Sequence, residues 1–266
     1  MLKIKMLKNI IKLIPGSNTL NKFLLHKKIQ NQFLRLNDAE HSQSLFYSQF
    51  INKGDLVFDV GCNIGSRTKL FLHLGGKVVG FEPQNELCNY LIGHLGRNKK
   101  FSLERTALGA ELGFSEIKIS DAHVLSSMST RWIEATKKSG RFDQYNWNET
   151  QKVAVSTLDE KIKTYGTPQF IKIDVEGYEF EVLKGLSHPI NFMSIEFTAE
   201  DLKNSQDCID LISNLGEYLF NFSIGESLIF EKKSWKTKDQ IVCLLKKQCL
   251  VDKRCWGDIY AKLVSV

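Results

Sequence analysis

Residues 56–65 read Leu-Val-Phe-Asp-Val-Gly-Cys-Asn-Ile-Gly, and this stretch decides the expected fold. An apolar run ends in Asp59, and two glycines four residues apart, Gly61 and Gly65, follow it. A buried parallel strand passes into a helix through such a tight turn, and a nucleotide-like ligand can approach the turn closely. The sequence therefore predicts a ligand site at this turn.

The composition is that of an ordinary globular protein, and its charge is unevenly distributed. The 266 residues are enough for one large α/β domain with a substantial core. Residues 1–37 hold eight of the 36 Lys and Arg residues and no acid, so the rest of the chain carries 28 bases against 30 acids. The body of the protein is not basic, and we expect no nucleic-acid partner.

The N-terminal residues 1–50 are expected to form a basic helical arm before a domain at 51–266. Apolar residues recur at helical spacing among lysines in 2–14 and again in 20–36. Such an arm could pack on the domain or on a partner subunit, and residues 1–36 could instead contact an anionic membrane surface. No apolar run reaches the roughly 20 residues of a membrane span, and no secretory signal pattern is seen, so we expect a cytoplasmic protein.

Six cysteines are present, and they show neither a Cys-x-x-Cys pair nor zinc-ligand spacing. Cys243, Cys249 and Cys255 recur every six residues, a period that gives no common face on a helix or a strand. We expect reduced thiols, with a disulfide or a metal site as the alternative.

Strands and helices alternate along the chain from residue 55 onward. Residues 55–108 show a β-α-β-α-β pattern, which indicates a parallel sheet. A hairpin is expected at 111–120, and the polar segment 126–147 is expected to be a lid or binding loop. Further strands are expected at 170–174, 192–197, 218–223, 228–230 and 259–264, with helices between them.

The turn after the first strand distinguishes between two classes of ligand. A dinucleotide site has the pattern G-x-G-x-x-G, whereas here Asn63 occupies the place of the second glycine. The carboxylate of Asp59 would repel a pyrophosphate but would suit the ammonium and sulfonium of S-adenosylmethionine. The alternative is a strand-turn-helix in which the glycines serve only the turn.

A second acid lies at the end of the next strand. Glu82 follows Gly61 by 21 residues and precedes Pro83. An acid at this separation accepts hydrogen bonds from both ribose hydroxyls of a bound nucleoside. The alternative is a surface carboxylate beside a proline turn.

The third acidic segment is the most distinctive, and it reads Ile-Lys-Ile-Asp-Val-Glu-Gly-Tyr-Glu at 171–179. Asp174 and Glu176 are two residues apart and share one face of a continuing strand, and Glu179 falls in the first turn of the next helix. The alternative is ordinary helix capping. Oxygen ligands of this kind would suit Mg²⁺, but the sequence does not require a metal.

These segments resemble the FkbM-type S-adenosylmethionine-dependent methyltransferases. The resemblance runs from about residue 54 to 196, and Trp-Gly-Asp-Ile-Tyr at 256–260 also fits; residues 1–50 lie outside it. It implies a Rossmann-like, seven-stranded, mostly parallel sheet with helices on both faces and an antiparallel last strand. It also implies methyl transfer to an oxygen of a small molecule, often a sugar hydroxyl.

We expect the following roles for the site residues. The donor contacts are Asp59, Gly61, Asn63, Gly65, Thr68, Glu82, Pro83, Ala107 and Asp174. Asp174 or Glu176 is expected to orient or deprotonate the acceptor hydroxyl, with His123 and His188 as alternative bases. The acceptor contacts are Ser126, Ser127, Glu179 and Glu196, with Trp132 and Trp147 as further candidates unless they only fasten their loop to the core.

Two rival functions are open on the sequence alone. A Rossmann dehydrogenase would bind NAD, and Asn63 together with Asp59 argues against it. A non-catalytic module at a membrane surface would use the basic arm and need no methyl donor.

Overall fold

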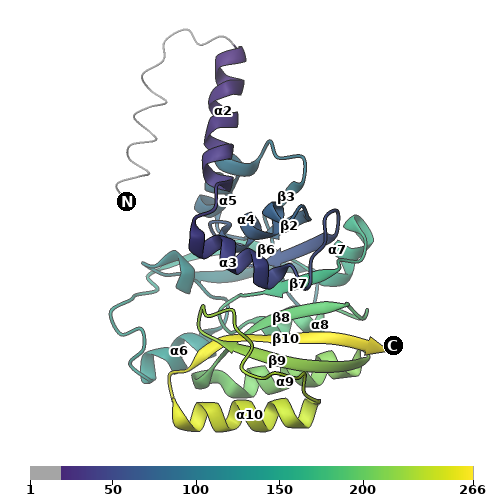
Figure 1. The fold of residues 1–266 in the computed structure, drawn as a ribbon. Coiled ribbons are helices and arrows are strands. Elements are labelled where there is room, and N and C mark those ends of the chain that lie inside the picture. The colour runs from purple at the N-terminus through teal and green to yellow at the C-terminus, as the bar shows by residue number, and fades with distance from the viewer. Residues whose placement is uncertain (1–18, 266) are drawn as a thin grey trace.

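The structure, a computed structural model, describes residues 19–265. The expected helix at 2–14 therefore lies outside the described residues. Within them the chain forms a three-layer α/β domain with one large sheet and one small sheet (Figure 1).

The large sheet has seven strands in the order β3-β2-β1-β7-β8-β10-β9. Their bounds are β1 (Leu56–Val60), β2 (Lys77–Phe81), β3 (Phe101–Glu104), β7 (Phe170–Ile173), β8 (Phe192–Thr198), β9 (Glu217–Ile224) and β10 (Trp256–Ser265). The strands β1, β2, β3, β7 and β8 are parallel, whereas β10 runs antiparallel to both β8 and β9. This confirms the predicted Rossmann-like methyltransferase fold with an antiparallel last strand.

Neighbouring residues of β1 point to opposite faces of the sheet and enter two separate cores. Val57 belongs to the core on one face, and Phe58 belongs to the core on the other. Because side chains alternate along a strand, Asp59 lies on the Val57 face. The alternation decides which side of the sheet each polar residue of the site reaches.

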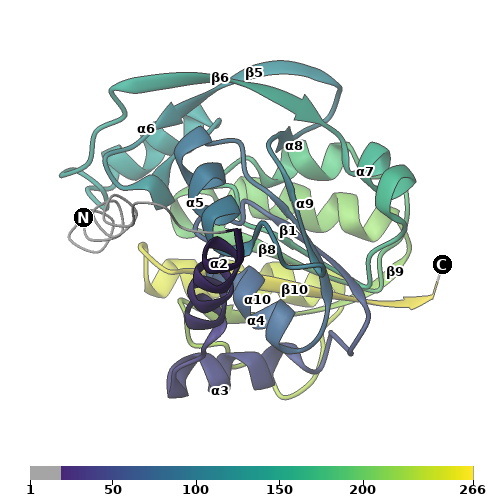
Figure 2. The ribbon, with the colours of Figure 1, turned by 90° about the horizontal axis from the view of Figure 1, so that it is seen from above.

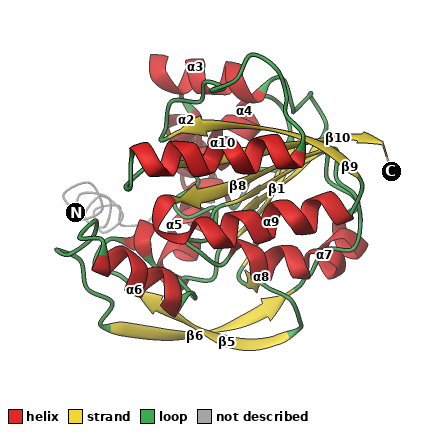
Figure 3. Cartoon of the chain, turned by 90° about the horizontal axis from the view of Figure 1, so that it is seen from below, coloured by secondary structure: helices red, strands yellow, loops and turns green. Residues whose placement is uncertain are grey.

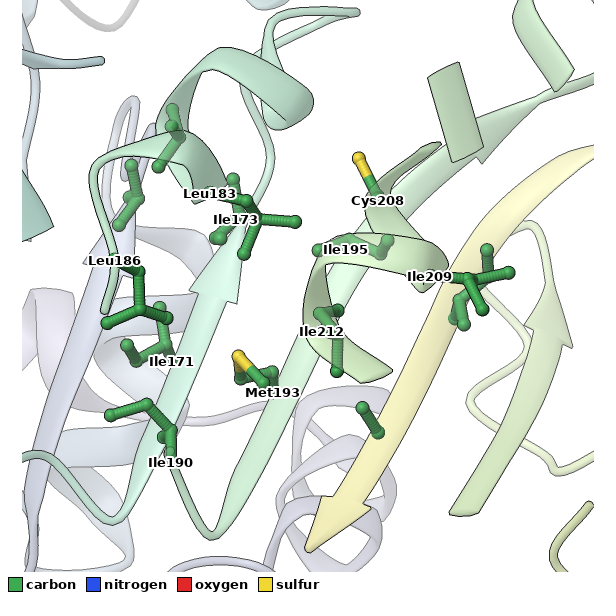
Figure 4. Close-up of a cluster of buried hydrophobic side chains, with 14 of the residues drawn as sticks. Ile171, Ile173, Leu183, Leu186, Ile190, Met193, Ile195, Cys208, Ile209 and Ile212 are labelled. Atoms are coloured by element: carbon green, nitrogen blue, oxygen red, sulfur yellow. The ribbon is translucent and has the colours of Figure 1, made fainter. Parts of the chain in front are cut away.

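Helices cover both faces. The Val57 face is covered by α3 (Asp38–Tyr47), α4 (Ser66–His73) and α5 (Asn85–Leu95). The Phe58 face is covered by α7 (Leu158–Tyr165), α8 (Glu179–Lys184), α9 (Leu202–Asn214) and α10 (Lys238–Val251), of which α8, α9 and α10 lie side by side in Figure 3. Figure 4 shows how Ile209 and Ile212 of α9 and Leu183 of α8 meet Ile171, Ile173 and Ile195 of the strands.

A second, three-stranded sheet has the order β4-β6-β5 and crosses one end of the domain (Figure 2). It consists of β4 (Ala107–Leu108), β5 (Gly113–Ile119) and β6 (Glu149–Ser156). The single strand expected at 101–108 is thus divided between two sheets, at the bend over 105–106. The hairpin expected at 111–120 is also wrong, because β5 pairs antiparallel with β6 rather than within itself.

The segment between β5 and β6 is more ordered than predicted. It contains η1 (His123–Leu125) and α6 (Thr130–Lys138), and the short helix η2 (Ala199–Asp201) contacts α6. The strand expected at 228–230 is not formed; the chain there runs beside β9 and makes a single bridge between Phe220 and Lys236.

The domain begins before the predicted boundary at residue 51. Tyr47 and Phe50 are buried in the Val57-face core, and the Phe50 ring stacks at 5.4 Å on Phe170 and at 5.6 Å on Tyr260. Of the predicted arm, α2 (Thr19–Leu34) projects from the body in Figure 1 and touches α4 and α5 near its C-terminal end. Membrane contact through residues 1–36 stays a prediction.

None of the helices in the described residues 19–265 has the length and apolar content needed to cross a bilayer.

Two of the cysteines lie in contact, against the expectation from their spacing. The Sγ atoms of Cys249 and Cys255 are 3.3 Å apart and both thiols are buried. The reason is that α10 ends at Val251 and the chain turns back, so Cys249 lies in the helix and Cys255 lies in the turn before β10.

Replacing Phe50 by Ala should lower the free energy of unfolding by about 3 to 5 kcal/mol, because the ring is buried between Phe170 and Tyr260. Urea unfolding followed by circular dichroism measures this change. Phe114→Ala is the control; Phe114 is 73% exposed, so it should cost less than about 1 kcal/mol. Equal small losses in both variants would show that residues 38–51 do not belong to the core.

Candidate active site

A cavity opens at the carboxyl ends of β1, β2 and β7. In open parallel sheets this edge is where ligands bind. Its walls include residues from both sheets and from the β5–β6 insertion. Those predicted from the sequence are Gly61, Asn63, Glu82, Pro83, Ala107, Ser126, Ser127, Asp174 and Glu176.

The turn after β1 has the tight geometry that the glycines predicted. Gly61 has φ +80°, and a Cβ built there would lie 1.9 Å from the carbonyl oxygen of Asp174. Asn63 is also left-handed, with φ 51°, which is the conformation that Asn tolerates better than most residues. The backbone N–H of Asn63 donates to Glu82 Oε2 at 3.0 Å, and its Nδ2 donates to the carbonyl of His123 at 3.4 Å.

Asp59 and Thr68, which we expected to contact the donor, lie behind this turn. Thr68 Oγ1 donates to Asp59 Oδ2 at 2.5 Å, and both residues are buried. Neither lines the cavity, because the alternation of β1 turns Asp59 toward α4. Burial raises the pKa of Asp59 to about 6. Gly65, the N-cap of α4, faces Leu91 and Phe33 rather than the cavity. The structure therefore gives these three residues a supporting position.

Glu82 lines the cavity, and its carboxylate is held by the backbone. Oε2 accepts the Asn63 N–H, and Oε1 accepts the Gln84 N–H at 2.8 Å. These bonds fix the carboxylate but leave each oxygen a second acceptor position for a ligand hydroxyl. Burial raises the pKa of Glu82 to about 7 against the opposing effect of these hydrogen bonds. Beside it, Pro83 is fastened by Gln151 Nε2, which donates to the Pro83 carbonyl at 2.6 Å.

The turn at 174–179 is organised by Glu179. Its Oε1 accepts the N–H groups of Val175 and Gly177 at 3.2 and 3.1 Å, and its Oε2 accepts Asn204 Nδ2 at 2.8 Å. The buried carboxylate thus holds the turn and does not line the cavity. This corrects the expectation that Glu179 contacts the acceptor.

Three other carboxylates come together at this turn. Oxygen atoms of Asp174, Glu176 and Glu196 all lie within 4.8 Å of one another. Glu176 has φ 53°, which brings its side chain round into the group instead of along the strand. Glu196 comes from β8 and takes the place in the group that we expected for Glu179. That the site requires no metal stays a prediction.

The same three acids perturb one another. Burial raises the pKa of Glu176 well above its usual value, and the nearby charges of Asp174 and Glu179 raise it further. Burial also raises the pKa of Glu196, with Glu176 and Asp174 adding to the effect. Like charges this close favour a shared proton.

The insertion between β5 and β6 closes the cavity on the far side. Ser127 Oγ donates to the carbonyl of Glu176 at 2.6 Å, and Ser126 Oγ accepts the Ser120 N–H at 3.1 Å. The Ser127 hydroxyl therefore has its donor committed to the protein, whereas the Ser126 O–H is still able to donate, and both residues line the cavity. Trp132 is 1% exposed and packs on Gly177. A Cβ built on Gly177 would lie 2.4 Å from the Trp132 Cβ.

The remaining aromatic and histidine candidates lie as follows. Trp147 Nε1 donates to the Leu125 carbonyl at 2.7 Å, so Trp147 fastens the insertion to η1. His123 lines the cavity, and burial lowers its pKa. His188 is exposed and pairs with Asp159 at 3.1 Å outside the cavity lining, which is no position for a base.

Sequence reasoning missed Lys172, which lies beneath the site. Its Nζ is 3.1 Å from both Asp174 Oδ2 and Asp258 Oδ1, and the residue is 2% exposed. The available signal was a lysine between two isoleucines in a strand predicted to be central.

Comparison with protein families assigns the chain. The methyltransferase FkbM domain matches residues 59–222, which is more than half of the sequence and spans all three acidic strand ends. The protein belongs to the FkbM methyltransferase family. It is accordingly an S-adenosylmethionine-dependent methyltransferase. A comparison with curated proteins finds no significant match.

Solved structures with a similar arrangement are distant in sequence. An O-methyltransferase from Bacillus cereus in complex with SAH is 13% identical, with 95% of this chain and 93% of that chain covered and a TM-score of 0.44. A putative O-methyltransferase from Klebsiella pneumoniae is 10% identical, with coverage of 97% and 95% and a TM-score of 0.42. Fibrillarin from Aeropyrum pernix with bound S-adenosyl-L-methionine is 9% identical, with coverage of 80% and 68% and a TM-score of 0.41.

Glu82 should make the stability of this FkbM protein depend on pH. Because the pKa of Glu82 is raised to about 7 in the folded state, the folded protein holds a proton that the unfolded chain releases between about pH 4.5 and about pH 7. The contribution of Glu82 to the unfolding free energy is therefore present below pH 4.5 and is lost as the pH rises to about 7. Glu82→Gln should make the fall in unfolding free energy from about pH 5 to about pH 8 shallower by about 2 to 3 kcal/mol.

Urea unfolding at a series of pH values measures that slope. Glu116→Gln, on the exposed edge of β5, is the matched control and should keep the wild-type slope. A Glu82→Gln slope equal to that of wild type would contradict the burial argument.

Proposed function

We propose that the protein transfers the methyl group of S-adenosylmethionine to a hydroxyl oxygen of a small acceptor, a sugar or a similar polyhydroxylated metabolite. The observation that carries the proposal is the convergence of Asp174, Glu176 and Glu196 within 4.8 Å beside the donor cavity. Transfer to a hydroxyl needs a proton acceptor, and this group supplies one.

The donor side of the proposal rests on three contacts of the cavity. Glu82, fixed by two backbone N–H groups, is placed to accept hydrogen bonds from ribose hydroxyls. Gly61 and Asn63 bring the backbone of the β1 turn close to the ligand. Asp174 also lines the cavity, and its carboxylate suits the cationic end of the donor.

The chemistry requires alignment and proton removal. Methyl transfer is an in-line displacement, so the acceptor oxygen must lie opposite the sulfur across the methyl carbon. The pKa of Glu176 and the pKa of Glu196 are both raised by burial and by their acidic neighbours. A carboxylate with a raised pKa is a better proton acceptor near neutral pH than an ordinary one. We therefore assign Glu176 as the base and Asp174 as the carboxylate that orients the reacting groups.

The acceptor side is polar, which favours a hydroxyl-bearing ligand. Besides its acids, the cavity is lined by the polar side chains of Asn63, Gln84 and Thr106. Amide, hydroxyl and carboxylate oxygens accept hydrogen bonds from ligand hydroxyls.

Gly61→Ala should abolish binding of S-adenosylhomocysteine, because the added Cβ would collide with the Asp174 carbonyl and φ is +80°. Calorimetric titration of the full-length protein should give micromolar binding in wild type and at least a hundredfold loss in this variant. Gly93→Ala is the control, since a Cβ at Gly93 meets nothing within 4 Å. Binding of NAD but not S-adenosylhomocysteine would overturn the donor assignment, and binding of anionic vesicles alone would support the non-catalytic rival.

Glu176→Gln should lower the rate of methyl transfer by about 10² to 10⁴-fold while leaving donor affinity within a few-fold, because it removes the base and keeps the shape. The assay incubates the protein with methyl-labelled donor and a polar metabolite extract and collects labelled methyl ethers. Asp174→Asn should also lower the rate, and the exposed Glu116→Gln should not. Label found only on nitrogen, or full turnover in Glu176→Gln and Asp174→Asn, would refute the proposal.

A further inference from the structure

Lys172 occupies an unusual position for a lysine. It lies in the middle of β7, with Asp59 of β1 and Ser194 of β8 as its partners in register. Its neighbours Ile171 and Ile173 enter the Phe58-face core, so its own side chain runs on the opposite face, below α4. A buried ammonium is costly unless anions compensate it, so its partners must explain its presence.

Two carboxylates provide the compensation, one directly after β7 and one in β10. Asp174 Oδ2 and Asp258 Oδ1 each lie 3.1 Å from Lys172 Nζ. Asp258 is buried on β10, where Tyr260 donates to its Oδ2 at 3.2 Å, so it belongs to the interior. Asp174 instead lines the cavity. Burial would lower the pKa of Lys172, but Asp174 and Asp258 raise it well above the usual value, and the ammonium stays charged.

The carboxylates of Asp174, Glu176 and Glu196 lie so close together that their negative charges repel one another. Asp174 binds Lys172 through one oxygen while its oxygens also lie within 4.8 Å of those of Glu176 and Glu196. At that separation, ionised carboxylates repel and take up a proton. The charge of Lys172 lowers the pKa of both glutamates against this effect.

We propose that Lys172 is a positioning residue of the acceptor side: its ammonium fixes the Asp174 carboxylate and offsets part of the negative charge of the Asp174, Glu176 and Glu196 group, so that Glu176 gives up its proton more readily than it would without Lys172. The role in catalysis rests on the proposed transfer to a hydroxyl. The ion pair and its effect on the glutamates do not, and they can be measured without an acceptor.

Other charged and titratable groups also face this cluster. They are Asp59 of β1, Tyr47 of α3, Arg67 of α4, Arg141 after α6, Glu179 of α8 and Asp258 of β10. Arg67 opposes the charge on Lys172, and Arg141 acts on Glu176 in the same direction as Lys172. A test must therefore change the charge at Lys172 and leave these groups in place.

The experiment is a carbon-13 NMR titration of the full-length protein labelled at the glutamate side-chain carboxyl. Glu176→Gln and Glu196→Gln identify the two resonances. Lys172→Met should move the titration midpoints of both glutamates to higher pH by about one unit. Lys172→Arg keeps the charge and should return them to wild-type values.

A second variant guards against misfolding, because Lys172→Met leaves two buried carboxylates without their partner. Lys172→Met combined with Asp258→Asn removes the interior pair together, and it should move both midpoints in the same direction as Lys172→Met. Unchanged midpoints in a folded variant, or an equal move in Lys172→Arg, would overturn the proposal. Failure of hydroxyl methylation in wild type would instead sink the proposed function and leave these midpoints as they are.

Discussion

The close approach of two strand-end turns is the constraint on which the site depends. The turn after β1 passes so near the end of β7 that no side chain fits at Gly61, where a Cβ would lie 1.9 Å from the Asp174 carbonyl. This contact aligns the acids that follow the two strands along one wall of the cavity. The left-handed backbone at Asn63 and Glu176 then turns the chain outward on both sides. The relative position of these two turns is thereby set by backbone packing.

The charged side chains buried beneath the cavity are compensated by partners inside the protein. The interior beneath the cavity holds Asp59, Lys172 and Asp258, and each has a partner from another element: Thr68 for Asp59, Asp174 and Asp258 for Lys172. Glu179 is satisfied in the same way by two backbone N–H groups and Asn204. The acids that line the cavity are Glu82, Asp174 and Glu176, whereas Asp59, Glu179 and Asp258 lie outside the lining.

The sequence predicts which strand ends carry the acids near the cavity, but it does not predict the side-chain partners of those acids. Glycine and acid positions at Gly61, Glu82 and Asp174 located the donor edge, because strand ends of a parallel sheet meet there. Asp59 and Glu179 do not reach the cavity as expected, because strand alternation turns Asp59 into the protein and the geometry of the 174–179 turn does the same for Glu179. Glu196 and Lys172 come from strands separated in sequence, and no local pattern reveals that Lys172 reaches β10. The split of residues 101–108 between two sheets likewise depends on tertiary pairing.

The β5–β6 ladder has an architectural consequence. Residues 113–119 pair in unbroken register with 149–155, so the insertion between them leaves the small sheet and returns to it at the same end. The insertion contacts the 174–177 turn through Ser127 and Trp132, and Arg131 and Arg141 hold it to η2. A change of length between β5 and β6 would therefore alter one wall of the cavity, while the ends of β1, β2 and β7 keep their positions.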